Sequence, residues 1–80
     1  MKTSSKETVR QHQRLLNNLK ALQRLYGIDA LAEATAISKQ TWIRRMKEPW
    51  SAFSVDDMRL IARFCNVDFV KLIDGELKIM

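Results

Sequence analysis

Four side chains between residues 40 and 47 carry groups that could bind a nucleic acid. Gln40, Ile43, Arg44 and Lys47 are spaced so that a helix places them on one face. They supply an amide, a methyl-bearing side chain, a guanidinium and an ammonium group, which suit base edges, thymine methyls and phosphates. The pattern favours contact with duplex DNA, although Ile43 could also be a simple exposed aliphatic residue.

Two short helices and a tight turn are expected to position these groups. Asp29 can cap a first helix over 30–34, and Ser38 can cap a second that runs from 39 to 46 or 47. Residues 35–37 break the pattern between them. A short helix, a turn and a second capped helix allow the two helices to meet steeply.

The opposite side of the second helix is predicted to be buried. Trp42 and Met46 are four residues apart and therefore share a face. Trp42 could instead be a stacking platform for a base, but this spacing favours the core. The small Ala32 suits the crossing point of the two helices, and Ile37 is expected to fill the core at the corner.

Further helices are predicted on both sides of this pair. Apolar residues three and four apart predict a long helix from Lys6 to Tyr26, ended by Gly27. Ser54, with Asp57 three residues later, predicts a capping box at the start of another helix.

The remaining segments complete the expected order of elements. Asn66 is expected to close the helix that follows Ser54, and Asp68 to cap a short helix over 69–73. Residues 48–53 are expected to form a loop, because the residue before a proline avoids the helical region. At least one of the loop's two aromatic side chains should pack on the core.

The stretch Leu31–Lys47 resembles the helix-turn-helix of phage repressors and Cro proteins, and the resemblance covers about residues 18–73. It includes the helix over 54–62 and the segment 65–72, and Arg44–Pro49 looks like a subgroup found in small phage-borne regulators. It implies an all-α fold, a five-helix bundle of the lambda-repressor-like type with the helix-turn-helix at its second and third helices. It also implies a sequence-specific regulator of transcription, with repression favoured, that binds an inverted-repeat operator as a homodimer.

The resemblance assigns base-reading roles to four residues, which are Lys39, Gln40, Ile43 and Arg44. Spacing alone supports the last three, whereas Lys39 lies on the flank of that face. Phosphate contacts are expected from four others, which are Ser38, Thr41, Arg45 and Lys47. A salt bridge from Arg45 to Glu33 or Glu48, or a position in solvent, is the alternative for that side chain.

Two positions depart from the family's pattern. The turn usually holds glycine and here holds Ala36, whose φ is expected near or modestly above zero, with strain but no change of fold. The position three after Trp42 is normally aliphatic and here is Arg45. Met46 is therefore expected to take over the core role, on a slightly rotated or longer helix.

The domain boundaries follow from these assignments. Residues 1–5 are expected to be disordered, 6–73 to form the DNA-binding domain, and 74–80 to form a C-terminal tail. Leu77, Ile79 and Met80 alternate with polar residues, so the segment 72–80 suits an edge strand that pairs with a second copy. A frayed chain end is the alternative.

Charge and composition narrow the classes of function. Residues 1–47 have a balance of +7 and residues 48–80 a balance of −2, which suggests an oriented contact with a polyanion. No apolar run could span a bilayer and the N-terminus is polar, so we expect no membrane segment, no signal peptide and a cytoplasmic protein. The single cysteine, Cys65, excludes an intramolecular disulfide and should be buried.

The sequence does not favour an enzyme. It has no glycine-rich phosphate loop and no nucleophile beside a base, and helix capping explains the acidic pair Asp56–Asp57. His12 has no second histidine or cysteine for a metal and is expected at the surface, so no cofactor or metal is predicted. The main rival is a protein-binding module, an antirepressor or adaptor, that meets an acidic partner. RNA binding is weaker, since no exposed aromatic platform is evident.

Overall fold

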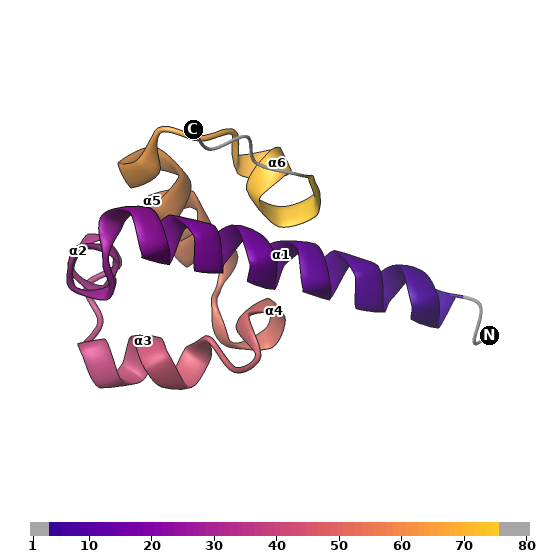
Figure 1. The fold of residues 1–80 in the computed structure, drawn as a ribbon, viewed down its shortest axis with the longest axis horizontal. Coiled ribbons are helices and arrows are strands. Elements are labelled where there is room, and N and C mark those ends of the chain that lie inside the picture. The colour runs from indigo at the N-terminus through magenta and orange to yellow at the C-terminus, as the bar shows by residue number, and fades with distance from the viewer. Residues whose placement is uncertain (1–3, 76–80) are drawn as a thin grey trace.

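The structure is a computed structural model that describes the backbone of residues 4–75 and the side chains of residues 10–75. Over this range the chain forms six helices and no strand: α1 (Ser4–Tyr26), α2 (Ile28–Ala34), α3 (Lys39–Arg45), α4 (Pro49–Ala52), α5 (Val55–Cys65) and α6 (Phe69–Asp74). Figure 1 shows α1 crossing the whole molecule, with α2, α3 and α4 on one side and α6 on the other. The all-α prediction is confirmed.

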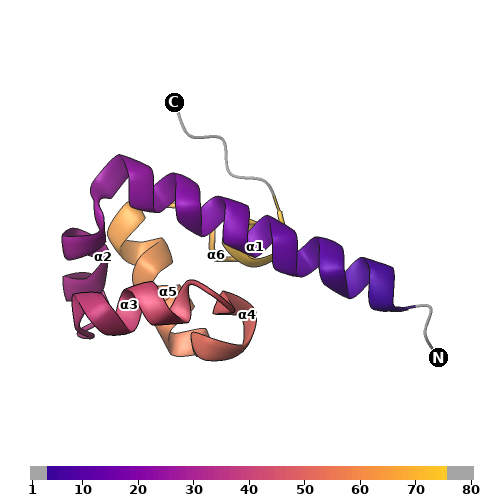
Figure 2. The same cartoon turned by 60° about the horizontal axis from the view of Figure 1, so that its bottom comes forward.

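The long helix α1 organises the molecule. Its apolar stripe packs against the rest of the chain, while its first turns extend beyond the other helices in both views (Figure 1, Figure 2). Gly27 ends it with a φ of 94°, a conformation that glycine adopts at little cost. The helix begins at Ser4 rather than Lys6, so Ser4 and Ser5 are helical where disorder was predicted, and residues 1–3 lie outside the described range.

The core is built from every part of the chain after residue 10. Its buried apolar side chains are Leu15, Leu19, Leu22, Leu31, Ala32, Trp42, Phe53, Met58, Ile61, Ala62, Cys65 and Leu72. Five of the six helices contribute to this set, and α4 contributes the fully buried Pro49. Burial of these surfaces, which is the main favourable term in folding, holds the short helices in place.

Local capping sets most helix boundaries, as the sequence predicted. Ser54 and Asp57 form the capping box of α5, with both hydrogen bonds 3.1 Å long. Asn66 ends α5 in the left-handed conformation, with a φ of 57°. The Asp68 carboxylate accepts two backbone N–H bonds at the start of α6.

Two local expectations were wrong. Asp29 does not cap α2, because the helix starts one residue earlier and Gly27 stands at the cap position without a side-chain bond. Residues 48–53 are not a loop, since Pro49 is the first residue of the four-residue helix α4. Proline suits that position, where its fixed φ is helical and no backbone donor is needed. The chain therefore has six helices over residues 4–75 rather than five.

Candidate nucleic-acid interface

The connection between α2 and α3 is short, and the backbone N–H groups of residues 35, 36 and 37 donate to carbonyl oxygens of α2. The Thr35 hydroxyl is buried and donates to the carbonyl oxygens of Leu31 and Ala32, at 2.9 and 3.1 Å. Ala36 takes a φ of 59°, further into the left-handed region than expected, which lets the Ile37 N–H reach the Ala32 carbonyl at 3.0 Å. In Figure 1 α2 is seen nearly end-on while α3 lies across the view, so the two helices meet steeply.

Trp42 anchors α3 to the rest of the molecule. Its side chain is fully buried, and its indole Nε1 donates to Gln23 Oε1 of α1 at 2.9 Å. Its ring packs against Phe53, with centroids 5.0 Å apart and planes inclined by 59°. Tilted aromatic contacts of this kind are favourable. Met46 is half-buried against the same core, in the role expected for it.

A second polar link holds the end of α3 against α5. Arg45 Nη1 donates to Asp57 Oδ2 at 3.1 Å, and its guanidinium lies 5.8 Å from the centre of the Phe53 ring. The expected partners of a salt bridge were Glu33 or Glu48, and the structure shows Asp57 instead. The same Asp57 oxygen accepts the Ser54 N–H of the capping box. Arg45 thus faces the body of the protein, with its charge offset by a carboxylate.

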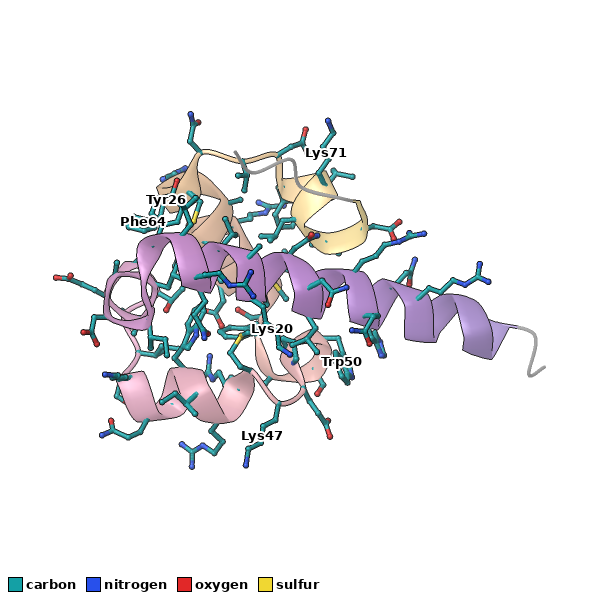
Figure 3. The ribbon with its side chains drawn as sticks, in the orientation of Figure 1. Lys20, Tyr26, Lys47, Trp50, Phe64 and Lys71 are labelled. Atoms are coloured by element: carbon teal, nitrogen blue, oxygen red, sulfur yellow. The ribbon has the colours of Figure 1, made fainter. Side chains whose placement is uncertain are left out.

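The opposite side of α3 is open to solvent. Gln40, Ile43, Arg44 and Lys47 are all exposed, with Ile43 at 48%. Figure 3 shows Lys47 pointing away from the body of the molecule. Within residues 10–75 these three polar side chains have no hydrogen bond or ion pair. An amide and two cationic groups therefore lie on one solvent-exposed surface.

The N-terminal end of α3 uses its polar groups internally. Ser38 Oγ accepts the Thr41 N–H at 3.1 Å and donates to Thr41 Oγ1 at 2.9 Å, which is the cap predicted from the sequence. Lys39 Nζ lies 3.7 Å from Asp29 Oδ1, and both side chains are well exposed. An exposed ion pair of this kind is weak and exchanges readily for another anion.

The structure corrects the expected length of α3 and part of the expected dimer segment. The helix ends at Arg45, with Met46 as its C-cap, rather than at residue 46 or 47. Leu72 is fully buried, and Asp74 forms an ion pair with Arg14 of α1 at 3.3 Å. These two residues are therefore engaged within one chain, against the basic first half, while 76–80 lie outside the described residues.

Several contacts at this site were not foreseen from the sequence. The links from Gln23 to Trp42 and from Asp57 to Arg45 join residues 19 and 12 positions apart. His12 was expected at the surface, but it is half-buried and stacks on Trp50 with ring centroids 4.3 Å apart. Helical spacing and capping signals involve residues within a few positions of each other, so they do not predict contacts between distant residues. A lone histidine and a tryptophan 38 positions later give no signal of their pairing.

Cys65 carries the single thiol of the chain. Cys65 is buried as predicted, and burial raises the pKa of its thiol to about 11, so the sulfur is protonated at neutral pH. In the part of the chain that the structure describes, no three His, Cys, Asp or Glu side chains gather where they could hold a metal ion. No helix there is long and apolar enough to cross a membrane.

Comparison with family models, curated proteins and solved structures gave no match to this chain. Function must therefore be inferred from the side chains of α3 and from the contacts that hold the helix in place.

Proposed function

We propose that the chain is a sequence-specific regulator of transcription that binds double-stranded DNA. In this proposal α2 and α3 act as a helix-turn-helix, and α3 lies in the major groove. The observation that carries it is the solvent-facing side of α3, where Gln40, Arg44 and Lys47 have no partner within residues 10–75. A helix fits the major groove, where each base pair presents a distinct pattern of donors and acceptors.

Each side chain has a role that its chemistry supports. Arg44 can form two hydrogen bonds with guanine, Gln40 two with adenine, and Ile43 can contact a thymine methyl. Lys47, at the end of α3, suits a phosphate, which fixes position without reading sequence. Lys39 can exchange its weak ion pair with Asp29 for a base or a phosphate. The Ser38 and Thr41 hydroxyls lie at the N-terminal end of α3, and we assign them to phosphates of the DNA backbone.

Arg45 is assigned a different role from the other basic residues. Its guanidinium is engaged by Asp57 and lies over Phe53, so we propose that it orients α3 rather than contacting a phosphate. Gln23 has the same role on the other side through Trp42. Base readout needs a helix that is held rigidly, because misplaced hydrogen bonds lose most of their energy.

The proposal includes a homodimer on an inverted-repeat operator. One seven-residue helix covers only a few base pairs, and a two-fold dimer places two such helices about one DNA turn apart. Repression is the simpler outcome, since a protein that covers an operator excludes other proteins from it. Such a regulator would act in the cytoplasm of a bacterial or phage-infected cell.

Selection of bound sequences from a random duplex pool tests this function. The proposal predicts enrichment of a defined motif arranged as an inverted repeat. The proposal would be contradicted if the bound sequences shared no motif, or if the protein bound no DNA at physiological salt.

Protein binding is the second candidate function, and one observation favours it. Tyr26 and Phe64 pack together with ring centroids 5.5 Å apart, yet 39% of Tyr26 and 44% of Phe64 remain exposed. Figure 3 shows them side by side near the C-terminal end of α1. Failure of the DNA selection would direct attention to this surface.

A further inference from the structure

A cavity of about 370 Å³ lies between α1, α4, α5 and α6, and none of its lining residues belongs to α3. Most of its wall is apolar, and Gln11 lines it as well. The aliphatic and phenyl side chains of the wall are Leu15, Phe53, Val55, Met58 and Ile73. The volume falls within the usual range of small-molecule sites, about 300–1,000 Å³. The hollow is partly open to solvent, so a ligand that fills it would displace water from apolar side chains.

Two aromatic rings line the same cavity. His12 of α1 and Trp50 of α4 stack with centroids 4.3 Å apart and planes only 4° from parallel. Trp50 is still 36% exposed, and Figure 3 shows its side chain beside α4, below α1. A flat aromatic molecule in the cavity would extend this arrangement, because aromatic rings pack well in offset stacks.

The charged group of the lining sets the polarity of a ligand. Asp74 is the only acidic residue among the lining residues, which carry no Lys or Arg. Its Oδ1 is held by Arg14 at 3.3 Å, while both side chains remain half-exposed. A carboxylate fixed in this way can accept a charge-assisted hydrogen bond from an ammonium group. The chemistry therefore fits a small aromatic compound that bears an amine.

Phe53 connects the cavity to α3. The ring is part of the cavity wall, and it also packs against Trp42 at 5.0 Å between centroids. The Arg45 guanidinium lies over the same ring at 5.8 Å. A molecule that fills the cavity therefore presses on a side chain that contacts both anchors of α3.

We propose that this cavity binds a small aromatic amine and that its occupancy changes the affinity of α3 for DNA. The regulatory part rests on the proposed function, whereas the binding part does not. A ligand shifts an equilibrium between two conformations only if its contacts with them differ. In this proposal the contact with Phe53 is the one that differs.

Titration of the full chain with tryptamine, followed by two-dimensional amide NMR, tests the site. The expected dissociation constant is below about 1 mM, which is reasonable for a ligand of this size. Val55→Trp, at a lining valine that is 57% exposed, should fill the cavity and abolish binding. Val70→Trp is the matched control, because this α6 valine is 67% exposed and lies outside the cavity. Equal binding by both variants, or no binding by the wild type, would overturn the proposal.

Indole-3-acetate separates the role of charge from that of the ring. It carries a carboxylate in place of the amine and should bind at least tenfold more weakly than tryptamine, because it lacks the ammonium donor for the Asp74 carboxylate. Equal affinities would contradict the proposed ligand class.

The regulatory part is measured by fluorescence anisotropy on the selected duplex, with and without saturating tryptamine. We expect the dissociation constant for DNA to change by about fivefold or more, the usual lower range of allosteric coupling. The Val55→Trp variant should show no such response. An unchanged affinity would contradict the coupling, and failure to bind DNA at all would contradict the proposed function while leaving the NMR result on the cavity intact.

Discussion

Ala36 has an unusual backbone conformation for its residue type. Its φ of 59° lies in the left-handed region, which costs an L-residue about 1–2 kcal/mol. Glycine removes that cost, but it also gives the unfolded chain more conformational entropy, which lowers the free energy of unfolding by about 0.4–1 kcal/mol. Ala36→Gly should therefore raise the free energy of unfolding, by up to about 1.6 kcal/mol, in urea denaturation.

Asn66→Gly is the control for this prediction. Asn66 has nearly the same φ, 57°, but asparagine visits this region more easily, so the gain should be smaller. If Ala36→Gly raises the free energy of unfolding no more than Asn66→Gly does, residue 36 is not strained.

Trp42 makes the contacts that attach α3 to α1 and to Phe53. Trp42→Ala removes a fully buried ring and leaves the Gln23 amide without its indole partner. Truncation of a buried aromatic costs about 3–5 kcal/mol, which approaches the total stability of a small domain. Near-ultraviolet circular dichroism should show loss of tertiary structure at 25 °C. A variant that folds normally but no longer binds DNA would instead place Trp42 against the ligand.

Helix boundaries were predictable where a single side chain sets them. Ser38, Ser54 and Asp68 cap their helices as expected, because each cap depends on residues within three positions. The short helix α4 was missed because Pro49 was interpreted only as a residue that stops the preceding helix. In the structure it also starts the next one.

The side chain of Asn18 fixes the end of α6 from another helix. Its Nδ2 lies 2.9–3.1 Å from the carbonyl oxygens of Lys71, Leu72 and Gly75, and the residue is buried. Asn18→Ala leaves these carbonyls without that donor and should cost about 1–3 kcal/mol. Native-state hydrogen exchange should show faster exchange of the α6 amides. Asn17→Ala, one position away and exposed, should change stability by less than about 0.5 kcal/mol. Unchanged protection of α6 in Asn18→Ala would refute this role.

The arrangement of the whole molecule was predictable only in outline. Helical spacing gave the all-α class and the buried side of α3 at Trp42, because both follow from local periodicity. It did not give the Arg45–Asp57 pair or the His12–Trp50 stack, which depend on how distant helices meet. The exposed face at Gln40, Ile43 and Arg44 was predicted correctly, because it is the face opposite Trp42.

Net charge gives a prediction for the molecule as a whole. The chain carries a formal charge of +5, with the positive excess in residues 1–47. DNA binding releases counterions, and log K falls with log salt by about 0.9 for each phosphate neutralised. Several exposed cations within residues 10–47 are candidates for phosphate contacts, so we expect a slope of magnitude about 4 or more for a dimer. Fluorescence anisotropy over a salt series measures it, and a slope near zero would show that no phosphates are neutralised.

The central claim is that the solvent-facing side of α3 reads base pairs, and Arg44→Ala tests it most directly. The measurement compares wild type and variant on the selected operator and on its single-base substitutions. Loss of the guanidinium should cost about 1–3 kcal/mol on the best sequence and relax the preference at one base position. Arg63→Ala, an exposed arginine on α5, is the matched control and should leave that preference unchanged. Lys47→Ala should weaken binding to all sequences about equally, as loss of a phosphate contact does. If Arg44→Ala retains both the wild-type affinity and the wild-type preference, α3 does not read the sequence and the account is wrong.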